Sequence, residues 1–203
     1  MATIAELSTG AGANQAVFNT VWACQAFVAE GTLAVSSGYI WGQKIAANLS
    51  TVYFDIYAAT SAAPTGSALT IASVDASGWS GTGNNTYGFL FTDNPTLNSG
   101  VWYAMAMRCT VAGATAGANW RYDNTSPESS PFGSSVTAGS TWSLTSSYVG
   151  IFGVFGSVPA GGANSVLLYG KIGAAAIATG GFSYVTYRDF TGKVAANGIV
   201  AGN

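Results

Sequence analysis

The sequence predicts an all-β protein with an antiparallel two-sheet β-sandwich, similar to a jelly roll. Apolar residues recur with a period of two in short runs, a spacing that places them on one face of a β-strand. Turn-forming residues such as those of Ala63-Pro-Thr-Gly66 separate the runs, and no long helical pattern interrupts them. Many short strands with this punctuation favour a sandwich over a parallel α/β fold.

The strands are assigned from this alternation along the chain. In residues 51–58, Val52, Phe54 and Ile56 share one face, which we assign to the core. In residues 101–111, the same alternation places Cys109 on a core face. The complete set of predicted strands is 17–28, 32–40, 51–58, 69–74, 87–92, 101–111, 118–122, 141–144, 148–155, 165–172 and 182–188.

Three segments are predicted along the chain. Residues 1–19 are polar and rich in Ala and Gly, which is typical of an arm. Residues 20–157 hold the sandwich domain. A Pro- and Gly-rich stretch then marks a boundary, and residues 158–203 form a C-terminal extension. Two interpretations of this extension stay open, because its strands either complete the same domain or form an assembly interface.

Composition excludes several classes of function. Charged residues make up 7% of the 203 residues, whereas about 25% is usual in soluble domains. Six Lys and Arg against eight Asp and Glu leave no basic surface for phosphates, so nucleic acid is not an expected partner. The absence of His excludes the Ser-His-Asp machinery and His-based zinc sites. We therefore expect no enzymatic activity and no cofactor.

The same composition bears on localisation. Polar residues interrupt every apolar stretch before the about 18 residues that span a bilayer, so no membrane insertion is expected. The first residues lack the basic and apolar regions of a secretory signal, which predicts synthesis in a host cytoplasm without a signal peptide. A surface rich in Ser, Thr, Gly and Asn is instead typical of proteins exposed outside cells. A component of the virion surface, released by lysis, accounts for both properties.

The two cysteines are too few for a disulfide scaffold or a four-thiolate metal site. We interpret Cys24 and Cys109 as small buried apolar residues. A disulfide between them stays an alternative if their strands are neighbours.

A dense group of polar and aromatic residues begins at Trp120. Sugar binding needs an aromatic face for stacking and fixed polar groups for the hydroxyls. In the alternative interpretation, Trp120 and Tyr122 pack into the core and Arg121 pairs with a carboxylate. Trp79 also has two interpretations, an exposed anchor or a cap on the end of the sandwich. The candidate glycan-binding residues are Trp79, Trp120, Arg121, Tyr122 and Asp123.

Two further interpretations concern the carboxylates of this group. Asp123 and Glu128 could serve as the acid and base of a glycosidase, but such pairs usually face each other across a cleft. Oxygen atoms of Asp123, Asn124 and Glu128 could bind calcium, although their spacing is not that of an EF-hand loop. Solvated loop carboxylates are the preferred interpretation, so no catalytic residue and no metal site is predicted.

Four stretches of the chain resemble a β-sandwich module found in phage virion proteins and in bacterial surface proteins. The resemblance spans residues 27–156, and its motifs are structural ones. It implies a jelly-roll-like, non-catalytic domain used for attachment, decoration or glycan contact. The stretches are Phe54-Asp-Ile-Tyr-Ala-Ala-Thr60, Pro64-Thr-Gly-Ser-Ala-Leu69, Tyr87-Gly-Phe-Leu-Phe-Thr92 and Pro95-Thr-Leu-Asn-Ser-Gly-Val-Trp-Tyr103.

We therefore expect a non-enzymatic virion structural protein, such as a phage decoration, fibre or tail-surface component. Its expected partners are copies of itself in a trimer or another symmetric oligomer, other virion proteins and a cell-surface glycan. Residues 2–19 and 160–203, which lie outside the resemblance, are expected to carry the self-association. The alternative function is a carbohydrate-binding module that recognises a host or environmental glycan.

Overall fold

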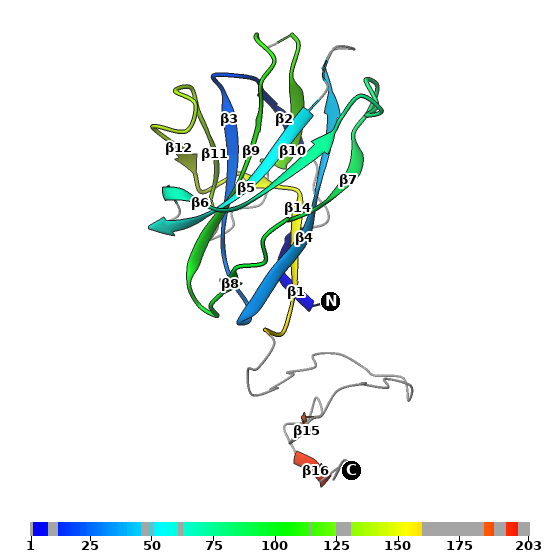
Figure 1. Ribbon diagram of the computed structural model, residues 1–203, viewed down its shortest axis with the longest axis vertical. Helices are drawn as coiled ribbons and strands as arrows, with labels where there is room; N and C mark the ends of the chain where they lie inside the picture. Colours follow the sequence, from blue (N-terminus) through cyan, green and yellow to red (C-terminus); the bar gives the residue numbers. More distant parts are fainter. Residues whose placement is uncertain are drawn as a thin grey trace. The chain divides into compact units, whose positions relative to one another are not determined.

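The computed structural model describes residues 2–7, 12–45, 49, 51–60, 63–113, 115–124, 131–159, 185–188 and 194–198. The chain forms two compact units, Met1–Ser157 and Val158–Asn203. The first unit is an antiparallel two-sheet β-sandwich, which confirms the predicted fold class (Figure 1). Over these described ranges, no helix is long and apolar enough to cross a membrane.

One sheet of the sandwich has eight strands. Its central strand, β4 (Leu33–Lys44), pairs with strands on both of its sides. Strands β2 and β10 pair along their whole length. The other seven strands are β1 (Ala2–Leu7), β2 (Gly12–Val17), β7 (Asn85–Leu90), β8 (Thr96–Leu97), β10 (Ala118–Asp123), β13 (Val149–Gly150) and β14 (Phe152–Ser157).

The facing sheet has six strands in a single path. Two of them, β12 and β6, lie at its edges. In order across the sheet, the strands are β12 (Ser143–Thr145), β11 (Phe132–Ser135), β3 (Trp22–Val28), β9 (Trp102–Cys109), β5 (Thr51–Thr60) and β6 (Ala63–Asp75).

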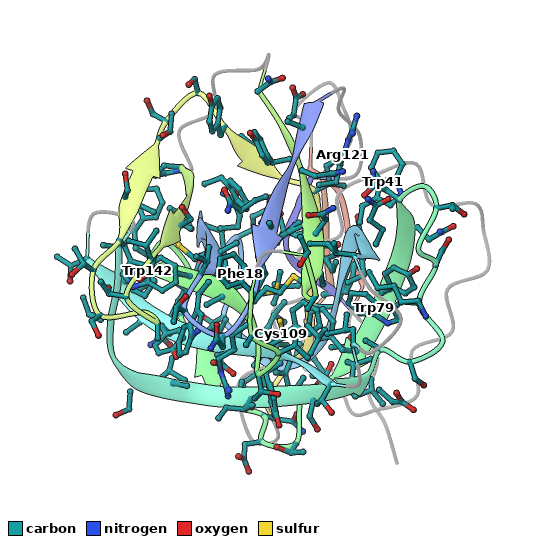
Figure 2. All side chains as sticks on the ribbon, turned by 90° about the horizontal axis from the view of Figure 1, so that it is seen from above. Phe18, Trp41, Trp79, Cys109, Arg121 and Trp142 are labelled. Atoms are coloured by element: carbon teal, nitrogen blue, oxygen red, sulfur yellow. The ribbon has the colours of Figure 1, made fainter. Side chains whose placement is uncertain are left out.

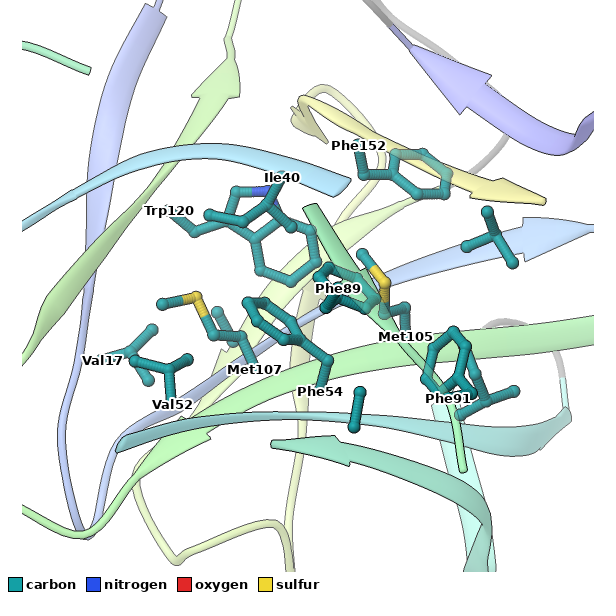
Figure 3. Close-up of a cluster of buried hydrophobic side chains, with 14 of the residues drawn as sticks. Val17, Ile40, Val52, Phe54, Phe89, Phe91, Met105, Met107, Trp120 and Phe152 are labelled. Atoms are coloured by element: carbon teal, nitrogen blue, oxygen red, sulfur yellow. The ribbon is translucent and has the colours of Figure 1, made fainter. Parts of the chain in front are cut away.

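The core lies between the two sheets, where their inward-facing side chains meet. Val52, Phe54 and Ile56 on β5 are fully buried, which confirms the predicted core face. The ring of Phe54 stacks on that of Phe89 from the other sheet, with the ring centroids 4.0 Å apart (Figure 3). Burial of apolar surface contributes about 25 cal/mol per Å², so this contact between the sheets is a main source of stability.

The N-terminal residues differ from the expected arm. Strand β1 pairs with β14 and strand β2 pairs with β10, so residues 2–7 and 12–17 belong to the eight-stranded sheet. Val17, at the end of β2, is fully buried in the core. This burial ties the segment down, because an apolar side chain between two sheets gains from leaving water.

The predicted strand over residues 17–28 is in fact interrupted by a turn. The Phe18 N–H donates to the Val21 carbonyl and the Val21 N–H donates back to the Phe18 carbonyl, at 2.9 and 3.0 Å. The Asn19 side chain accepts a hydrogen bond from the Thr20 N–H at 2.9 Å, an interaction that favours turns. The chain thereby passes from β2 in one sheet to β3 in the other.

The predicted turn at residues 63–66 lies within strand β6. Thr65 and Pro64 pair with Ala58 and Ala59 on β5, and the register shifts between Ile56 and Ala58. Next to this irregularity Gly66 has a φ angle of +68°, a conformation that L side chains rarely adopt. The turn residues therefore produce an irregular stretch of strand instead of a reversal of the chain.

The second unit holds β15 (Val185–Arg188) and β16 (Val194–Gly198), which pair antiparallel. The predicted strand over residues 165–172 lies outside the described residues. The same holds for most of the segment 160–203 that was expected to carry self-association.

Both cysteines are free and buried. Cys24 pairs with Ala106, and Cys109 lies three residues further along the same neighbouring strand. Side chains three residues apart on a strand point to opposite faces, so the two thiols are not placed to form the disulfide left open above. The Cys109 Sγ instead donates to the Val17 carbonyl at 3.2 Å, in agreement with its predicted core position.

Candidate functional site

Four of the five residues predicted to contact a glycan lie on β10, where they are divided between its two faces. Trp120 is 0% exposed, and its Nε1–H donates to the Ile151 carbonyl at 3.0 Å. Because a strand alternates its side chains, Arg121 and Asp123 lie on the opposite, outer face of the eight-stranded sheet. Trp120 offers no ring face to a sugar, and its predicted binding role is corrected to a core role.

Tyr122 also faces the interior. Its ring stacks on Phe132 and packs against Tyr148, with ring centroids 5.1 and 4.9 Å apart. Burial raises the pKa of the Tyr122 hydroxyl, and Tyr148 adds to this effect. The ring is held by the core on the side of the sheet opposite to Arg121, so Tyr122 and Arg121 do not form one binding surface.

Trp79 packs onto the end of the sandwich. It is 5% exposed, and its indole stacks on Tyr87 with centroids 4.0 Å apart and an interplanar angle of 7°. The Tyr87 hydroxyl accepts a hydrogen bond from the Ser80 N–H at 2.7 Å, which fixes the loop that carries Trp79. This geometry favours the cap over the exposed anchor.

The outer face of the eight-stranded sheet brings Arg121 next to an aromatic residue that the sequence interpretation did not include. The guanidinium carbon of Arg121 lies 5.7 Å from the centroid of the Trp41 ring (Figure 2). The two residues come from β10 and β4, and 80 positions separate them in the chain. An Arg over an indole face is a cation–π contact, which contributes about 0.5–1 kcal/mol when exposed.

A single residue holds this pair in register. The Trp41 N–H donates to the Ile151 carbonyl at 3.1 Å, and the Ile151 N–H donates to the Arg121 carbonyl at 2.9 Å. The same Ile151 carbonyl accepts the bond from Trp120 on the core side. Because these bonds are made by the backbone and by a buried indole, the positions of Trp41 and Arg121 are fixed by the fold itself.

The Arg121 side chain has few polar partners. Its Nε atom is buried and makes no hydrogen bond, and the ion pair found among the described residues does not include Arg121. Guanidinium carries five N–H donors. A partly buried Arg with unused donors is able to bind an acceptor group from outside the chain.

Uncharged amide side chains surround Arg121 on this face. Asn14 lies directly across from it on β2. Asn119 lies two residues away on the same strand, and Gln43 pairs with Asn119 across β4. We call Trp41, Arg121, Asn14, Asn119 and Gln43 the outer-face cluster. It combines one aromatic ring, one cation and three amides on rigid strands. Asp123, two residues from Arg121 on the same face, is buried and makes no ion pair with Arg121.

The six-stranded sheet carries a second arginine on its outer face, and this one is paired with a carboxylate of the chain. Arg108 donates from Nε and Nη2 to the two carboxylate oxygens of Asp55, at 2.6 and 3.3 Å. Its guanidinium lies 4.2 Å from the Tyr53 ring centroid and 5.5 Å from that of Trp22. The Tyr57 hydroxyl donates to the same carboxylate at 3.3 Å. These contacts join neighbouring strands on the outer face of the six-stranded sheet, so we assign them a structural role.

Burial controls the acidity of this second cluster. Asp55 is 1% exposed, and burial raises the pKa of its carboxyl although the bonds and charge of Arg108 oppose the rise. Burial and the neighbouring Asp55 raise the pKa of Tyr57 to about 12. Tyr57 therefore remains a hydrogen-bond donor at neutral pH.

The carboxylates considered for catalysis and for calcium do not form a site in the described residues. Asp123 is buried and Asn124 is exposed, whereas Glu128 lies outside the described residues. Within the described part of the chain, no three His, Cys, Asp or Glu side chains gather where they could hold a metal ion.

Comparison of the sequence with protein-family models and with curated proteins gives no match. The function is therefore inferred from the fold and from the surfaces described above.

Proposed function

We propose that this chain is a non-enzymatic structural protein of a phage virion surface, and that it assembles with copies of itself through strand β6. The low charge of the chain and the resemblance to virion modules support the first part. The second part is supported by one structural observation, the position of β6 as a long edge strand of the six-stranded sheet.

Strand β6 is a long edge strand with apolar residues open to solvent. It has 13 residues and pairs only with β5 in the strand order of its sheet. Leu69 and Ile71 on its outer face are each 41% exposed. Exposed edges of this kind are templates for pairing with another chain, and soluble proteins usually block them.

Two of the usual blocking features, charged residues and proline, are missing from the centre of β6. Residues 67–74 contain neither a charged residue nor a proline. The Ile71 carbonyl accepts a bond from the Thr92 hydroxyl at 3.3 Å, which shows that its backbone groups face away from β5. Alternation then places the backbone groups of Leu69 and Ser73 on the same open side. The backbone groups of Leu69 and Ser73 are available for a further strand, whereas the Ile71 carbonyl is already bonded to Thr92.

A second copy of β6 fits this edge. Antiparallel pairing about a two-fold axis would extend the six-stranded sheet across both protomers, in the closed symmetry that most homo-oligomers adopt. Asp75 lies at the end of β6. In an antiparallel pair the two Asp75 carboxylates are therefore far apart, and no like charges face each other. The expected symmetric oligomer is then a dimer.

Sedimentation velocity of the full chain at micromolar concentration tests this assembly. We expect a dimer for the unmodified chain and a monomer for Ile71→Lys, because two like charges would meet near the axis. Ser73→Pro should also give a monomer, because proline removes a donor on the open edge.

Val136→Lys is the matched control, since Val136 is 72% exposed and lies outside β6. It adds the same charge and should leave the dimer intact. A monomeric full chain would refute the proposal, and a dimer that persists in both β6 variants would place the interface elsewhere. Mass spectrometry of purified phage particles tests the virion location, which requires the chain to be a stoichiometric component.

A further inference from the structure

We propose that the outer-face cluster binds a carbohydrate that carries a carboxylate group. The cluster lies on the eight-stranded sheet, whereas the proposed assembly uses an edge of the six-stranded sheet. The binding site is therefore independent of the proposed function and would leave a virion protein free to contact a cell surface.

The charge of the ligand is inferred from Arg121. This side chain is partly buried, makes no ion pair with a described carboxylate and has a buried Nε without a hydrogen-bond partner. A cation in such a position is costly unless an acceptor neutralises it. Planar guanidinium matches a carboxylate through two parallel hydrogen bonds, which gives both strength and orientation.

The sugar character of the ligand is inferred from the remaining cluster. Trp41 is partly exposed, its backbone N–H is bonded to the Ile151 carbonyl, and its indole lies against the Arg121 guanidinium. A fixed aromatic ring can stack on the apolar face of a pyranose. The amides of Asn14, Asn119 and Gln43 provide donors and acceptors for hydroxyl groups at neighbouring register positions.

The surroundings argue against a phosphate polymer as ligand. A nucleic acid requires several cations along its path. The chain has six Lys and Arg in total and a net charge of −2. Lys44, at the end of β4, donates from Nζ to the Ser77 carbonyl at 2.7 Å and does not extend the charge of Arg121. One cation beside three amides fits a single carboxylate among hydroxyls.

Isothermal titration calorimetry of the full chain with defined oligosaccharides tests the site. The acidic probes are trigalacturonate and 3′-sialyllactose, and their neutral counterparts are methyl-esterified trigalacturonate and lactose. We expect at least one acidic probe to bind in the millimolar range or tighter, and its neutral counterpart to bind about tenfold more weakly, the loss of one charged hydrogen-bond pair.

Variants assign the binding to the cluster. Arg121→Gln and Trp41→Ala should each weaken the acidic probe about tenfold. Arg121→Lys keeps the positive charge but loses the two parallel hydrogen bonds that a planar guanidinium makes to a carboxylate, so it should also weaken binding. Lys44→Gln removes one positive charge outside the cluster and should leave the affinity unchanged.

A second readout does not depend on any variant. In the unmodified chain, the acidic probe should shift the NMR signal of the Trp41 indole N–H, and the buried Trp120 indole should not move. The proposal is overturned if neither acidic probe binds at millimolar concentration, or if the neutral counterparts bind equally well. It is also overturned if Arg121→Gln folds and retains full affinity.

Discussion

The two arginines on the outer faces of the sandwich occupy opposite chemical situations. Arg108 donates to both oxygens of Asp55 and lies beside two aromatic rings. Arg121 lies beside one aromatic ring and has a buried Nε without a partner. The guanidinium of Arg108 is therefore occupied by a carboxylate of the chain, whereas that of Arg121 keeps donors for an external acceptor.

The difference arises because strand pairing places a carboxylate near Arg108 but an amide directly across from Arg121. On the six-stranded sheet, Arg108 pairs directly with Tyr53, and Asp55 lies two residues further along the same strand on the same face. On the eight-stranded sheet the residue directly across from Arg121 is Asn14. Asp123, two residues from Arg121 on the same face, is buried and makes no ion pair with it, and an amide does not neutralise a guanidinium. An arginine beside amides is thus the one to examine for a ligand.

The largest expected effect concerns the core that lies behind the Arg108 cluster. Phe54→Ala should lower the free energy of unfolding by about 3–5 kcal/mol, because a buried ring loses both its transfer energy and its packing. Tyr53→Ala, on the outer face, should cost clearly less. Urea unfolding measures both, and the reverse order would show that the two faces of β5 are exchanged.

Removal of Arg108 has the next largest effect. Arg108→Ala should lower the free energy of unfolding by about 2 kcal/mol, since hydrogen bonds to charged groups contribute about 1.5–3 kcal/mol and Asp55 would stay buried without its partner. Thermal unfolding followed by circular dichroism checks this value. A change below about 0.5 kcal/mol, the range of ordinary surface substitutions, would mean that the cluster is not structural.

The pH dependence of the Arg108 cluster follows from Asp55. Its pKa is raised in the folded chain, chiefly by burial, so the folded state holds this proton more tightly than the unfolded state. Its contribution to stability is therefore complete below the unfolded pKa of about 3.9 and is lost as pH rises through the folded pKa.

Asp55→Asn isolates this contribution. The stability of the unmodified chain relative to Asp55→Asn should fall as pH rises from about 3 to 7, measured by urea unfolding. An advantage of the unmodified chain that instead grows with pH would show that pairing with Arg108 outweighs burial.

The smallest expected effect sharpens the contrast between the two arginines. Arg121→Ala should change the free energy of unfolding by only about 0.5 kcal/mol, because a cation–π contact with Trp41 is the interaction lost. Thermal unfolding beside Arg108→Ala provides the measurement. Equal costs for both variants would mean that Arg121 is also a structural residue.

Much of the fold could be predicted because it depends on local alternation. The face of Val52, Phe54 and Ile56 and the burial of Cys109 follow directly from a period of two. The pairing of residues 2–7 with β14 could not be predicted, because it joins segments about 150 residues apart and both are short and weakly patterned. A short segment with weak alternation of apolar and polar residues does not indicate which distant strand it pairs with.

The candidate site could be predicted only in part, for a similar reason. Arg121 was predicted from its polar character and belongs to the outer-face cluster, whereas Asp123 is buried and Trp120 and Tyr122 on the same stretch face the core. Trp41 was missed because its contact with Arg121 depends on the register between β4 and β10 and on the Ile151 bonds. That register is a tertiary property which a single strand does not encode.

Because both thiols are buried, the surface of the sandwich presents no native cysteine to a thiol-reactive label. Burial raises the pKa of Cys24 and of Cys109, so neither is a reactive thiolate at neutral pH. Because the chain has only two cysteines, a new one at exposed Val136 would be its single accessible attachment point. Val136→Cys then carries a fluorophore or a gold particle that reports the position of the protein in an assembly, and both native cysteines stay in place.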